Sequence, residues 1–73
     1  MTVAEGALKV DAAVGALMAH GVSRKISTSA LEQLGVAACA DVAAEVSDAL
    51  AVGQATNAAG LARTLLRERG AKI

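Results

Sequence analysis

The chain has 73 residues, no Phe, Tyr, Trp or Pro, one Cys, and seven Lys or Arg against seven Asp or Glu. A length of 73 residues leaves room for one helical domain, residues 1–73, and a net charge of zero gives no general attraction to nucleic acid or anionic membranes. Because no aromatic side chain is present, recognition of RNA or single strands by stacking on aromatic platforms is excluded.

The composition predicts an all-α fold. Proline is absent, Ala, Leu, Glu, Lys and Arg are abundant, and the chain lacks the alternation of apolar and polar residues that is typical of strands. We expect a small three- to four-helix bundle, with helices at about 3–20, 30–34, 36–52 and 57–69.

The first predicted helix, 3–20, begins with a capping box of Thr2 and Glu5 and ends at Gly21. It is apolar around most of its circumference, and such a helix is buried on more than one side. A chain this short covers one side, so a line of small residues on the other side is predicted to meet another chain. The members of this small-residue line are Ala4, Leu8, Ala12, Gly15 and Ala19.

The middle of the chain is predicted to hold a connector, a short helix and a long helix. Ser29 and Glu32 form a second candidate capping box, which begins the short helix at 30–34. If residues 30–52 formed one straight helix, Leu34 would lie on the polar face of that helix. We therefore expect a break at Gly35. The long helix ends at Gly53, and Thr56 or Asn57 caps the last helix.

Charge is unevenly distributed along the chain, with acidic residues on the long helix and basic residues on the last one. A tight antiparallel hairpin of these helices places Arg63 near Glu45 and Arg67 near Asp41. Such pairs within one chain stabilise it by about 0–1 kcal/mol each, whereas the same charges on two copies would orient them. The charged residues of this predicted interface are Asp41, Glu45, Asp48, Arg63, Arg67 and Arg69.

No residue set indicates an enzyme, a metal site or a cofactor. His20, the single histidine, lies in the last turn of a helix, where a partly positive imidazole suits the dipole. Cys39 lies on an apolar stripe without a basic neighbour, as a small buried hydrophobe does. The carboxylates of Asp41, Glu45 and Asp48 lie on an outer helix face. The simplest interpretation is that water solvates them and that they have no role in acid–base chemistry.

The sequence carries no signal for export or membrane insertion. The N-terminal segment has an acidic residue where a signal peptide needs a basic region, and no run approaches 18 apolar residues. A single unpaired cysteine fits a reducing compartment. We therefore expect a cytoplasmic protein, or part of a particle assembled inside the cell, with no transmembrane span.

The small size predicts an interaction protein. A well-buried Leu or Val contributes roughly 1.5–3 kcal/mol, while ordering each residue costs roughly 1.5 kcal/mol, so small domains usually need a further source of stability. With no disulfide or metal to supply it, we expect burial against a second copy or a larger protein. A non-enzymatic structural subunit of an alanine-rich oligomer, such as a bacterial or phage virion or shell component, fits this expectation.

A DNA-binding regulator is the alternative. Residues 48–69 can be aligned with a helix-turn-helix, with Asn57, Arg63 and Arg67 placed to contact DNA. The first helix of that pair is acidic, and phosphates repel acid, which weakens the hypothesis. Nucleic acid is therefore a possible but not a favoured partner.

Overall fold

The computed structural model of the chain describes the backbone of residues 3–73 and the side chains of residues 9–73. Four helices follow one another, α1 (Val3–Ala19), α2 (Arg24–Leu34), α3 (Val36–Ala51) and α4 (Ala58–Glu68), and residues 3–73 contain no strand. The prediction of a small all-α bundle is confirmed.

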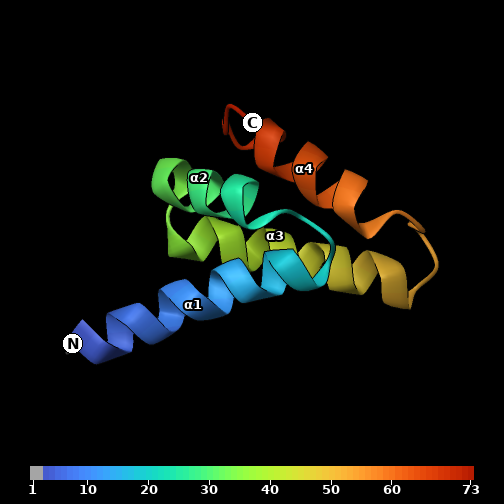
Figure 1. Ribbon diagram of the computed structural model, residues 1–73. Helices are drawn as coiled ribbons and strands as arrows, with labels where there is room; N and C mark the ends of the chain where they lie inside the picture. Colours follow the sequence, from blue (N-terminus) through green and yellow to red (C-terminus); the bar gives the residue numbers. More distant parts are fainter. Residues whose placement is uncertain (1–2) are drawn as a thin grey trace.

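The helix α3 is the centre of the bundle. It packs against α1, α2 and α4, and α1 also contacts α2 (Figure 1). The helices α1 and α3 run in one direction and α2 and α4 in the other (Figure 1). The first turns of α1 extend past the beginning of α3, which makes the molecule elongated, with extents of 38 × 24 × 17 Å.

The core is built from few large side chains. Leu17 of α1, Val42 and Val46 of α3 and Leu66 of α4 are fully buried. On α3 the two valines are one turn apart and so lie on the same face. Small residues, mostly alanine, fill the space around them. Leu17, Val42 and Val46 therefore face the core, whereas Val10 and Met18 of α1 are exposed.

The helix α2 begins at Arg24, well before the predicted start at residue 30. Ser23 has an extended backbone, and its hydroxyl accepts a hydrogen bond of 3.2 Å from the N–H of Ile26, so Ser23 is the N-cap. The predicted capping box of Ser29 and Glu32 is wrong, because both residues lie inside the helix. Ile26 packs against the core, and this burial outweighs the weak helix preference of the adjacent Ser and Thr residues.

Gly35 alone joins α2 to α3, which confirms the predicted break. Its φ of 90° and ψ of 170° belong to a region that is almost restricted to glycine. Its N–H donates to the carbonyl of Leu31 at 2.8 Å, and its own carbonyl accepts from the N–H of Cys39 at 3.2 Å. This one residue therefore ends one helix and begins the next.

The C-terminal residues fold back over α2. Ala71 is buried, and the side-chain amide of Gln33 makes two hydrogen bonds with the backbone of Lys72. The Lys72 N–H donates to Gln33 Oε1 at 2.7 Å, and Gln33 Nε2 donates to the Lys72 carbonyl at 3.2 Å. These contacts connect the segment after α4 to the first half of the chain.

Candidate interaction surface

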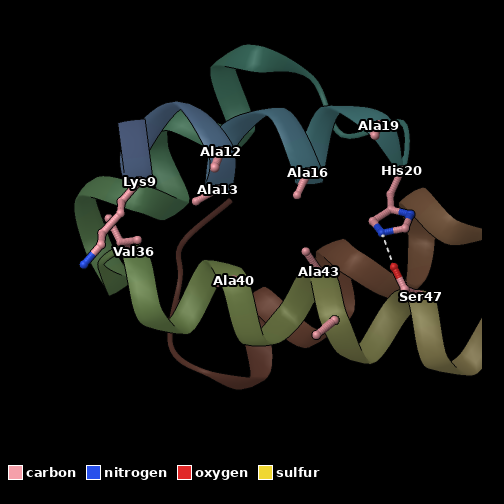
Figure 2. Close-up of a pocket in the computed structure, with 11 residues that line it drawn as sticks. Lys9, Ala12, Ala13, Ala16, Ala19, His20, Val36, Ala40, Ala43 and Ser47 are labelled. Carbon is pink, nitrogen blue, oxygen red and sulfur yellow. Dashed lines mark hydrogen bonds between the residues drawn. The ribbon is translucent and has the colours of Figure 1, made fainter. Parts of the chain in front are cut away.

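An open groove of about 680 Å³ runs between α1 and α3 (Figure 2). Lys9 and Val36 lie at one end, and His20 and Ser47 lie at the other. Its walls between these ends are short apolar side chains from both helices. These are Ala12, Ala13, Ala16 and Ala19 from α1, and Ala40, Ala43 and Ala44 from α3.

The two helices that form the groove are parallel and in register. His20 Nε2 lies 3.2 Å from Ser47 Oγ, and these residues are 27 positions apart. Lys9 and Val36, at the opposite end, differ by the same number of positions. On each wall four of the lining positions follow a spacing of 4-3-4, the spacing of a coiled-coil seam. These positions are 9, 13, 16 and 20 on α1 and 36, 40, 43 and 47 on α3.

The groove is open because alanine ends at Cβ. Two facing rows of alanine leave room between the helices that a row of leucines would fill. The large side chains of the same two helices, Leu17, Val42 and Val46, are fully buried in the core and do not line the groove. The groove borders the core, because its lining residues Ala13 and Ala43 are buried core residues.

The groove is nearly free of charge. Lys9 at one end and the imidazole of His20 at the other are the ionisable groups among its lining residues. The acidic residues of α3 do not line it, although Asp48 follows Ser47 directly and is exposed. An uncharged concave surface of this kind suits the apolar face of another helix.

The structure places two members of the small-residue line that the sequence predicts on α1 in the groove. Ala12 and Ala19 line the groove and are exposed. Gly15 is exposed but is not among the lining residues. Ala4 and Leu8 lie outside the residues whose side chains the structure describes.

Sequence reasoning missed the second wall of the groove. It treated α3 as a helix with one apolar and one acidic face, and it did not recognise that Ala40 and Ala44 extend an uncharged surface from α1. The sequence did contain a pattern that indicates the second wall, because the same 4-3-4 spacing occurs in both helices. Pairing the two patterns at an offset of 27 residues would have brought the two walls together.

The predicted ion pairs between α3 and α4 are wrong. Glu45 pairs with Arg69, at 2.8 Å between Oε1 and Nη2, and not with Arg63. This is the one ion pair among residues 9–73, so Arg67 and Asp41 are not joined either. The connection between the helices spans residues 52–57, and α4 then crosses α3 at an angle (Figure 1). This geometry shifts the contacts away from those of a tight hairpin.

The three residues of the DNA-binding alternative have local surroundings that do not require DNA. Asn57 caps α4, because its Oδ1 accepts from the N–H of Gly60 at 2.9 Å. Arg67 Nε donates to the carbonyl of Ile73 at 3.2 Å, and Arg63 is half-buried. These contacts explain Asn57 and Arg67 as parts of the fold, and they add no support to DNA binding.

Cys39 is a core residue, as the sequence predicts. Its side chain is fully buried among the apolar residues of the core, and this burial raises the pKa of its thiol. Within the described residues, no group of three or more His, Cys, Asp or Glu side chains could hold a metal ion.

A second hollow, of about 410 Å³, lies between the first turns of α2 and the C-terminal residues. Lys25 and Lys72 border it, and both are exposed. The hydroxyls beside them belong to Ser23, which caps α2, and Ser29, which accepts from Gln33. These groups already have roles at the surface of the fold, so we take the α1/α3 groove as the candidate site.

Comparison of the chain with protein families, with characterised proteins and with solved structures finds no match. In the part of the chain that the structure describes, no helix is both long enough and apolar enough to cross a bilayer.

Proposed function

We propose that this chain is a non-enzymatic interaction subunit that packs its α1/α3 groove against a second copy or a larger protein in an assembly. The observation that carries the proposal is the groove itself, which is open, has Lys9 as the one charged side chain among its lining residues, and is lined by alanine on both sides. Small side chains let a partner helix approach closely, so that many atoms come into van der Waals contact.

The small core supports the same proposal. The largest fully buried side chains are Leu17, Leu66, Val42 and Val46, together with the smaller Cys39. Each of these leucines and valines contributes roughly 1.5–3 kcal/mol on burial. Because the stability of a domain is a small difference between large terms, further burial in the groove is a substantial gain for a chain of this size.

Charge is proposed to set the orientation of the partner. Asp41 and Asp48 are exposed, and neither makes an ion pair with another residue in the range 9–73. Arg63 is half-buried and is likewise without an acidic partner in that range. Glu45 and Arg69 already neutralise each other within the chain, so the first three residues remain for contacts between molecules.

A structural subunit of a bacterial or phage virion, or of a shell, is the type of assembly that we propose. Such particles are built from many copies of small proteins, and a groove that accepts a helix suits this use. The single buried Cys39 supports assembly in a reducing compartment such as the cytoplasm.

Site-specific crosslinking tests this proposal. A photoreactive amino acid replaces Ala40, which is exposed in the groove, and a matched variant carries it at Thr28, which is exposed on α2. In cells that carry the gene, light is expected to yield a discrete crosslinked product from position 40 and none from position 28. Equal products from both positions, or none from either, would contradict the proposal.

The DNA-binding alternative predicts a different result. A regulator would bind duplex DNA with an affinity that falls steeply as salt rises, because phosphate contacts release counterions. Replacing Arg63 and Arg67 together with alanine would then abolish binding. An interaction subunit shows no salt-dependent shift of duplex DNA.

A further inference from the structure

We draw no further inference here: the strongest candidate, the open alanine-lined groove between α1 and α3, carries none, because nothing in the structure shows what covers it.

Discussion

The imidazole of His20 and the hydroxyl of Ser47 lie 3.2 Å apart and join the end of α1 to α3 (Figure 2). This hydrogen bond spans 27 positions of sequence and lies at one end of the alanine-lined groove. The facing alanines can slide past one another without a large steric cost. A directional bond at the end of the groove is therefore well placed to fix the register of the two helices.

A double-mutant cycle on His20 and Ser47 should show a favourable coupling of about 0.5–1 kcal/mol, the value of an ordinary exposed hydrogen bond. His20→Ala and Ser47→Ala are each expected to lower the free energy of unfolding, and the double variant is expected to lose less than their sum. Urea denaturation measures all four proteins. Strictly additive losses would show that the two side chains do not stabilise each other.

The same substitution should have opposite effects at Gly15 and Gly35. Gly15 lies in α1, and a Cβ there meets nothing within 4 Å, so Gly15→Ala is expected to stabilise the chain by about 0.5–1 kcal/mol. Gly35 has a φ of 90° and a ψ of 170°, and alanine there is expected to cost about 1–3 kcal/mol.

Thermal and urea unfolding of the two glycine variants measure both effects. A Cβ on Gly35 also meets nothing within 4 Å, so steric contact with neighbours is not a competing cause of its loss. The backbone explanation fails if Gly35→Ala is as stable as the original chain. It also fails if Gly15→Ala loses stability.

Ser27→Ala is expected to stabilise the chain by about 1 kcal/mol. The Ser27 hydroxyl is fully buried, and its oxygen has no hydrogen-bond partner in the structure. Removing an unsatisfied buried hydroxyl recovers its desolvation cost, and alanine is also the better helix former. Thr28→Ala, at an exposed position of the same helix, gains from helix preference alone and serves as the control. If Ser27→Ala gains no more than Thr28→Ala, the hydroxyl carries no penalty.

The sequence predicted those features that depend on nearby residues. Gly35 ends α2 and Asn57 begins α4, and both boundaries have local causes. Backbone conformation and side-chain capping act within a few residues. The all-α class followed from composition. The burial of Cys39 followed from its place on an apolar stripe, which is also a local pattern.

Features that depend on contacts between distant elements were missed. The start of α2 at Arg24 depends on the burial of Ile26 against other helices, so residues 21–29 were predicted to be a connector and Ser29 to be the cap. The pairing of Glu45 with Arg69 depends on the angle between α3 and α4. The small-residue line predicted on α1 contains Ala12 and Ala19 of one wall, but the groove itself required the parallel register of α1 and α3. Sequence periodicity gives the faces of each helix but not the angles at which the faces meet.

The thiol of Cys39 should make the stability of the chain depend on alkaline pH. Burial raises its pKa above the ordinary value of 9.0, so the folded state holds the proton more tightly than the unfolded state does. The stabilising contribution is fully present below pH 9 and declines as pH rises through the folded pKa, because only the unfolded chain loses the proton readily. Urea unfolding at about pH 8 and about pH 10 should therefore show a larger loss for the original chain than for Cys39→Ala, by at most about 1.4 kcal/mol per pH unit. The other side chains are the same in both proteins, so their contributions cancel in the comparison. Equal losses in the two proteins would mean that the thiol ionises as easily in the fold as outside it.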